Sequence, residues 1–195
     1  MRSQKIRDLD TPELEGQLRD IQEQLFRLRL QMSMGQMEGV KKMRAMRKNR
    51  ARIYTVLRER ELASASAHYG EQHSVTVRAL MGLGRNALSR GQVAEAEPYL
   101  RRALAVRQKL HPAGHWRIAE ASATLGQCLL RARRFQEAET LLSQGYEGLR
   151  ASKDATPQET RAVLNNLVAL YESWGRPADA ARYRAQKADA DRAQR

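Results

Sequence analysis

The hydrophobic positions in about the first sixty residues recur at alternating steps of four and three. Alternation of this kind lines apolar side chains along one side of an α-helix and is typical of a coiled-coil seam. One seam occupies residues 14–32 and a second occupies residues 43–57: Leu14, Leu18, Ile21, Leu25, Leu28 and Met32, then Met43, Met46, Ile53 and Leu57. The connection around residues 35–39 is short, so the pattern predicts two antiparallel neighbouring helices.

The start of the first helix carries a complete set of initiation signals. Asp10 is suited to the N-cap position, and Glu13 follows three residues later, which together form a capping box. Leu9 and Leu14 occupy the two positions of a hydrophobic staple. In the second helix Arg50 stands where the seam requires an apolar residue, so its guanidinium is expected to reach out at the seam edge.

The hydrophobic pattern changes after residue 66 and repeats with a period of 42 residues. Several equivalent positions hold the same residue: Leu83, Leu125 and Leu167, Ala96, Ala138 and Ala180, and His73 with His115. Gly91 and Gly175 lie two periods apart, with Arg133 between them. Each unit follows the order helix, short turn, helix, and self-similarity on this scale predicts a solenoid of stacked helical pairs.

Composition supports an all-α protein and limits its chemistry. Leu, Ala and Met dominate the apolar residues, and all three favour helices. Cys128 is the only cysteine, so neither an intrachain disulfide nor a thiolate metal cage can form. No apolar run is long enough to span a membrane, and the N-terminus lacks the apolar stretch of a signal peptide. The sequence therefore predicts a cytoplasmic protein without membrane contact.

Positive charge is concentrated in the second helix. The chain carries a formal net charge of +13, and residues 41–60 contain nine basic residues and one acidic residue. At about 100° per residue, Lys41, Arg44, Lys48 and Arg52 point away from the seam. Ala51 and Thr55 lie among them and are small enough to let a phosphate backbone approach. This face predicts RNA binding, and a solvated basic face on an ordinary coiled coil is the alternative.

Two strings resemble the family of large-subunit ribosomal protein twenty-nine: residues 25–38 (LFRLRLQMSMGQME) and residues 46–59 (MRKNRARIYTVLRE). The opening residues 6–9 (IRDL) fit the same family. The resemblance implies a helical hairpin that binds large-subunit rRNA near the peptide exit tunnel, beside a neighbouring ribosomal protein. The expected RNA-binding residues are Arg29, Gln36, Lys41, Arg44, Arg47, Lys48, Arg52 and Arg58.

The second half resembles the tetratricopeptide repeat, through patterns such as Leu83-Gly84, Gly91, Ala96 and Leu100. The usual period is about 34, and the longer one, with histidine-containing connections, resembles the kinesin-light-chain variety. Such repeats hold protein or peptide partners, so a protein or peptide ligand is expected here. The residues expected to contact it are Arg78, Arg85, Gln127 and Asn165, for which a solvent-facing role is the alternative.

The sequence thus predicts a hairpin over residues 1–63, a linker over 64–68 and tetratricopeptide-like repeats over 69–195. The expected function is a structural constituent of the large ribosomal subunit, located on the cytoplasmic ribosome. The alternative is a tetratricopeptide protein-interaction adaptor with an N-terminal coiled coil. The histidines lie in connections without ligand spacing, and no catalytic residue, metal site or cofactor is expected.

Overall fold

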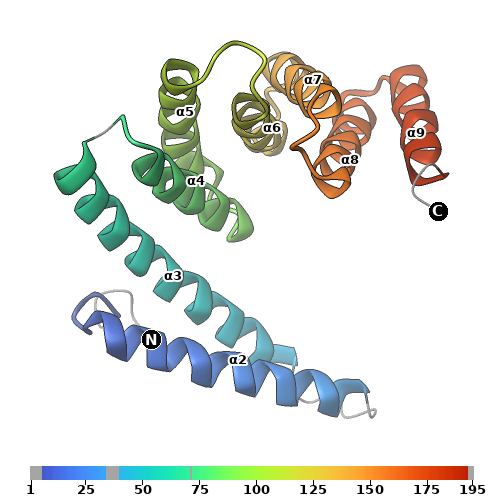
Figure 1. Ribbon diagram of the computed structural model, residues 1–195. Helices are drawn as coiled ribbons and strands as arrows, with labels where there is room; N and C mark the ends of the chain where they lie inside the picture. The colour runs from blue at the N-terminus through green and yellow to red at the C-terminus, as the bar shows by residue number, and fades with distance from the viewer. Residues whose placement is uncertain (1–5, 34–39, 71, 193–195) are drawn as a thin grey trace.

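A computed structural model describes residues 6–33, 40–70 and 72–192, and these ranges contain helices but no strands (Figure 1). The all-α prediction is confirmed. The helices are α2 (Thr11–Ser33), α3 (Val40–Tyr69), α4 (Ser74–Ser89), α5 (Val93–Leu110), α6 (Trp116–Arg131), α7 (Phe135–Ala151), α8 (Pro157–Trp174) and α9 (Pro177–Arg192). Helix α2 lies along α3, and the later helices follow one another in pairs.

The α2–α3 hairpin begins and packs as the sequence predicts. The Asp10 carboxylate accepts a hydrogen bond from the Glu13 backbone N–H at 2.8 Å, and the Glu13 carboxylate accepts one from the Asp10 N–H at 2.9 Å. Every predicted seam residue belongs to one of two small apolar clusters between the helices, one around Leu14 and Ile53 and one around Leu25 and Met43. Two narrow clusters of this kind bury little surface, so the hairpin needs further contacts for its stability.

Helices α4 to α9 form three stacked pairs around one continuous apolar core. The equivalent leucines and alanines of the 42-residue period are all buried: Leu83, Leu125, Leu167, Ala96, Ala138 and Ala180. The turn after the first helix of each pair also repeats, because Gly91, Arg133 and Gly175 adopt left-handed backbone with φ of 78°, 60° and 76°. The predicted solenoid is therefore confirmed.

Two of the histidines cap helices of the array. The Nδ1 atom of His73 accepts a hydrogen bond from the Val75 N–H, and that of His115 accepts one from the Arg117 N–H, at 3.2 and 3.1 Å. Each therefore satisfies one of the backbone donors that a helix start leaves without a partner. The third pair begins instead with a capping box formed by Thr156 and Glu159. The period of 42 at His73 and His115 thus reflects a structural role.

The connection between α5 and α6 makes the array sensitive to pH. The rings of His111 and His115 stack with centroids 4.2 Å apart. Partial burial of His111, and then the positive charges of His115, Arg117 and Arg107, lower its pKa below the ordinary value. The unfolded chain therefore binds this proton more readily than the folded chain, and the stabilisation present above a pH of about 6.5 is lost as the pH falls.

We expect a lower thermal midpoint of unfolding at a pH of about 5.5 than at about 7.5, and a smaller difference in His111→Gln. Circular dichroism at 222 nm on the full chain measures both. The carboxyl of Glu120, whose pKa is lowered, titrates below this window and does not contribute. An equal drop in the variant would contradict the role given to His111.

The predicted linker over residues 64–68 is wrong, because these residues lie inside α3, which continues to Tyr69. Alanine is the strongest helix former, so a stretch of alternating Ala and Ser does not interrupt a helix by itself. Ala65 is only 4% exposed and lines the groove where α3 meets Val75 and Ala79 of α4. One uninterrupted helix therefore serves both the hairpin and the repeat array.

Cys128 is fully buried in the core of the array, as expected of a small core residue. Burial is the main influence that raises the pKa of its thiol, which disfavours the nucleophilic thiolate. Among the described residues, no three His, Cys, Asp or Glu side chains are placed to hold a metal ion. No helix in the same ranges has the length and apolar character needed to cross a bilayer.

Candidate nucleic-acid interface

The expected RNA-binding residues form two groups that differ in exposure. Arg29 on α2 and four residues near the start of α3 are exposed: Lys41, Arg44, Arg47 and Lys48. Arg52 and Arg58, farther along α3, are half-buried, and Gln36 lies outside the described residues. These four exposed basic residues of α3 lie within its first three turns, and we call them the outer basic strip.

The outer basic strip is free for an external ligand. Within the described ranges, Lys41, Arg44, Arg47 and Lys48 make no ion pair with the rest of the chain. Most other arginines do, including Arg85, Arg101 and Arg134 in the array. Four unpaired cations on successive turns of one helix give a strong local positive potential.

Helix α4 packs on α3 at Ala51 and Thr55, the two small residues that the sequence predicts would let a phosphate backbone approach. The Asn86 side-chain amide donates to the Ala51 carbonyl at 3.0 Å and to the Thr55 hydroxyl oxygen at 2.9 Å, and Arg90 also donates to Thr55. Thr55 is 8% exposed. Ala51 and Thr55 do permit close approach, and here the approaching element is α4, which covers part of this face, while both residues also line the cleft described below.

Contacts with α4 continue along a second seam of α3. The chain of Arg58 packs over Gly82, where an added Cβ would lie 3.2 Å from Arg58 Nε. Leu62 packs against the array core, and Tyr69 stacks on His73 with ring centroids 4.6 Å apart. The positions again alternate by four and three: Ala51, Thr55, Arg58, Leu62, Ala65 and Tyr69. Sequence reasoning missed this seam because it contains only one aliphatic residue larger than alanine.

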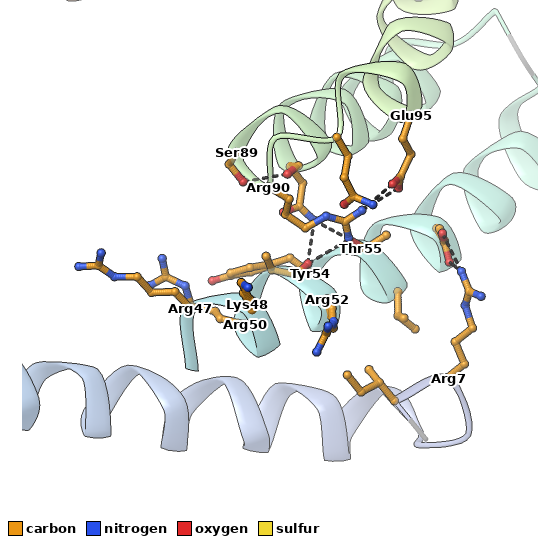
Figure 2. A pocket seen from close by; sticks show the side chains of 16 residues that line it. Arg7, Arg47, Lys48, Arg50, Arg52, Tyr54, Thr55, Ser89, Arg90 and Glu95 are labelled. Carbon is orange, nitrogen blue, oxygen red and sulfur yellow. Dashed lines mark hydrogen bonds and ion pairs between the residues drawn. The ribbon is translucent and has the colours of Figure 1, made fainter. Parts of the chain in front are cut away.

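A cleft of about 790 Å³ opens where the turn between α4 and α5 meets α3 (Figure 2). We call it the junction cleft. Its lining includes six basic and two acidic residues, an excess of four positive charges: Arg7, Arg47, Lys48, Arg50, Arg52 and Arg90 against Glu59 and Glu95. Both carboxylates are already paired, Glu59 with Arg7 at 3.2 Å and Glu95 with Arg90 at 2.7 Å.

Arg50, at a seam position of α3, contributes its side chain to the lining of the junction cleft. Its half-exposed side chain lies at the seam edge, as the sequence predicts, and lines the cleft. The aromatic ring of Tyr54 lies in the same cleft, with its hydroxyl 3.4 Å from the Gln22 side-chain amide of α2. The end of α4 adds Ser89 to the lining, and the turn that follows adds Arg90 (Figure 2). The cleft is thus built jointly by the hairpin and the first repeat.

The expected partner-binding residues of the repeats do not all meet. Arg85 and Gln127 line one groove of about 280 Å³, together with Glu120, Thr124 and Asn166. Asn165 is exposed but does not line this groove, and Arg78 lines a separate groove against α3. Thr124 and Asn166 are one period apart, a signal from which the groove position could have been found.

Charge in the repeat groove centres on Glu120, which pairs with Arg85 and, at 2.7 Å, with Arg107. Burial is the largest single influence on its pKa and raises it, but the two guanidinium groups together hold the pKa below the ordinary value. Glu120 is therefore ionised near neutral pH, and it reduces the positive charge that Arg85 offers to a ligand.

Known proteins resemble the two parts of the chain separately. The Ribosomal L29 protein family matches residues 4–60, and the Tetratricopeptide repeat family matches residues 75–151. The large ribosomal subunit protein uL29 of Solibacter usitatus is 62% identical over 63 residues, which cover 32% of this chain and 94% of that protein. The uL29 of Mycolicibacterium smegmatis is 47% identical over 68 residues, covering 35% of this chain and 88% of that protein.

Solved structures resemble the whole chain in fold. BtubC (BKLC) from P. vanneervenii has a TM-score of 0.65 at 15% identity and covers 95% of this chain and 93% of its own. A putative kinesin light chain of Podosopora anserina with nearly identical TPR-like repeats has a TM-score of 0.59 at 19% identity, covering 100% and 97%. At these identities the likeness concerns the fold, and it extends over the hairpin as well as the repeats.

Proposed function

Because the chain belongs to the L29 family of large ribosomal subunit proteins, we propose that its hairpin binds large-subunit rRNA near the peptide exit tunnel. The proposed RNA-binding unit is residues 1–63, and residues 69–195 form a repeat module that binds a protein or peptide. The observation that carries the proposal is the outer basic strip, which is exposed and makes no ion pair with any other residue that the structure describes. Phosphate oxygens of RNA are the ligands that such lysines and arginines bind best.

A neighbouring ribosomal protein has a suitable docking surface on α2. Phe26 and Leu30 are 66% and 53% exposed, and they lie one helical turn apart on the side away from α3. Large apolar side chains that are grouped and exposed mark protein contacts more often than isolated ones do. We propose that this pair contacts the neighbouring protein, while α3 contacts RNA.

The test of rRNA binding is co-sedimentation of the full chain with large subunits over increasing salt. In Lys41→Gln/Arg44→Gln, the slope of log affinity against log salt should flatten by almost two units, since each lost phosphate contact contributes about 0.9. The control Lys109→Gln/Arg117→Gln removes the same charge from exposed positions of the array, and its slope should equal that of the unsubstituted chain.

Two outcomes would contradict the proposal. Equal slopes in both double variants would exclude the outer basic strip as the RNA surface. If the unsubstituted chain failed to travel with the large subunit at moderate salt, the adaptor function would be favoured. In that case the fold shared with kinesin-light-chain-type repeats would be the better guide to function.

A further inference from the structure

The turn between α4 and α5 brings polar residues of the first repeat against the basic part of the hairpin. This turn lies outside the part of the chain that matches the L29 family, which is residues 4–60. The junction cleft therefore exists only where a repeat array follows the hairpin. We propose that it binds a single-stranded segment of RNA, a proposal that rests on the rRNA-binding function proposed above.

Charge and shape favour a phosphodiester chain as the occupant. Arg47, Lys48 and Arg50 line the cleft and, within the described ranges, make no ion pair. The carboxylates of Glu59 and Glu95 are neutralised by Arg7 and Arg90, so they oppose an incoming anion only weakly. Guanidinium groups present planar forks that match two phosphate oxygens at once.

The aromatic ring of Tyr54 favours a single strand over a duplex. Unpaired bases stack on aromatic side chains and on arginine planes, whereas the bases of a duplex already stack on one another. Tyr54 is half-buried and lies among the cations of the cleft. A volume of about 790 Å³ accommodates a short stretch of one strand and is too small to enclose a segment of double helix. An acidic peptide would use the cations but would gain little from the ring.

The binding test uses the full chain and a fluorescein-labelled oligouridylate, followed by fluorescence anisotropy. Ser89→Glu places a negative charge on the repeat side of the cleft, and we expect about fivefold weaker binding at low salt. Ser173 is the matched control, because it is exposed and lies two periods of 42 residues after Ser89, at the corresponding end of α8. Ser173→Glu should leave the affinity unchanged.

The second pair of variants tests stacking. Tyr54→Leu should weaken oligouridylate binding by about tenfold, and Tyr54→Phe, which keeps the ring, should not. Polyglutamate of similar length is the probe for an acidic peptide. If polyglutamate bound as well as the oligonucleotide and Tyr54→Leu affected neither, the cleft would be a peptide site and the proposal would be overturned. Melting curves of each variant identify any loss of affinity that comes from unfolding.

The cleft and the proposed function fail in different ways. Oligouridylate binding that ignores Ser89→Glu and Tyr54→Leu overturns the cleft proposal, even where subunit association still depends on Lys41 and Arg44. Failure of the unsubstituted chain to associate with the large subunit overturns the proposed function instead. The two sets of variants share no residue, so each result has one meaning.

Discussion

Replacing Ala65 with proline should lower the free energy of unfolding of the full chain by about 3 kcal/mol or more. Ala65 lies inside α3 and is 4% exposed, so proline removes a hydrogen bond of the helix and clashes with the preceding turn. The break falls where α3 packs on α4, and both the hairpin and the first repeat lose support. Urea denaturation followed by circular dichroism at 222 nm measures the loss.

Ala113→Pro is the control for this substitution. Ala113 occupies the second position of a turn closed by a hydrogen bond from the His115 N–H to the Pro112 carbonyl at 3.1 Å. Gly114 follows with φ of +82°, which makes this a type II turn, where proline is favoured at the second position. Ala113→Pro should leave stability unchanged or raise it slightly. If Ala65→Pro were equally harmless, residues 64–68 would be a linker in solution.

The variant Gly145→Ala/Gly148→Ala should be destabilised by roughly 3 kcal/mol, because α6 and α7 cross there without room for two methyl groups. A Cβ at Gly145 would lie 2.8 Å from the Cβ of Ala123 and 3.0 Å from the Ala119 carbonyl oxygen. A Cβ at Gly148 would lie 2.6 Å from the Cβ of Ala119. Backbone atoms cannot move aside as a flexible side chain would, so the helices must separate.

A glycine elsewhere in the chain separates crowding from helix propensity. Gly16 lies in α2 with only the tip of Arg19 near an added Cβ, at 4.0 Å. Gly16→Ala should therefore stabilise the chain by up to about 1 kcal/mol. At Gly148 the nearest obstacle is the Ala119 side chain alone, so Ala119→Gly should offset much of the cost of Gly148→Ala. Additive effects of these two substitutions would show that the crossing relaxes easily.

The parts of the fold that could be predicted from the sequence are those that depend on regularly spaced large apolar residues or on strong helix-capping residues. The capping box at Asp10 and the seam of Leu14 and Ile53 each leave a local signal in a few neighbouring residues. The 42-residue period at Leu83, Leu125 and Leu167 records the same core position three times. In each case the spacing alone determines which face is buried.

The contact between hairpin and array leaves no comparable signal. Its second seam uses Ala51, Thr55 and Arg58, which read equally well as a solvated or RNA-facing surface. The hydrogen bond from the Asn86 side-chain amide to the Ala51 carbonyl shows that α4 covers this surface. Asn86 lies 35 residues after Ala51, and no periodicity in the sequence connects these two residues. The misplaced linker has the same origin, since Ala and Ser give a helix without showing what covers it.

The candidate site divides along the same line. The outer basic strip follows from charge clustering at helical spacing, which is visible in Lys41, Arg44 and Lys48. The junction cleft requires Ser89 and Arg90 to arrive from another element, so only the folded chain reveals it. A cluster of positive charge on one helix can be predicted from the sequence, whereas the shape of a cleft depends on tertiary contacts between separate elements.

Because α3 is one continuous helix, it fixes the orientation of the repeat array, and of any ligand bound there, relative to the hairpin. A flexible five-residue tether would spread the array over roughly 12 Å relative to its anchor. A helix packed on α2 through one seam and on α4 through the other, two residues and hence about 160° apart at Ile53 and Thr55, removes that freedom. A ligand bound in the repeat groove would therefore be held at a fixed direction and distance from the hairpin. Its effective concentration near that one position would be higher than with a flexible tether, which would let it sample a larger volume.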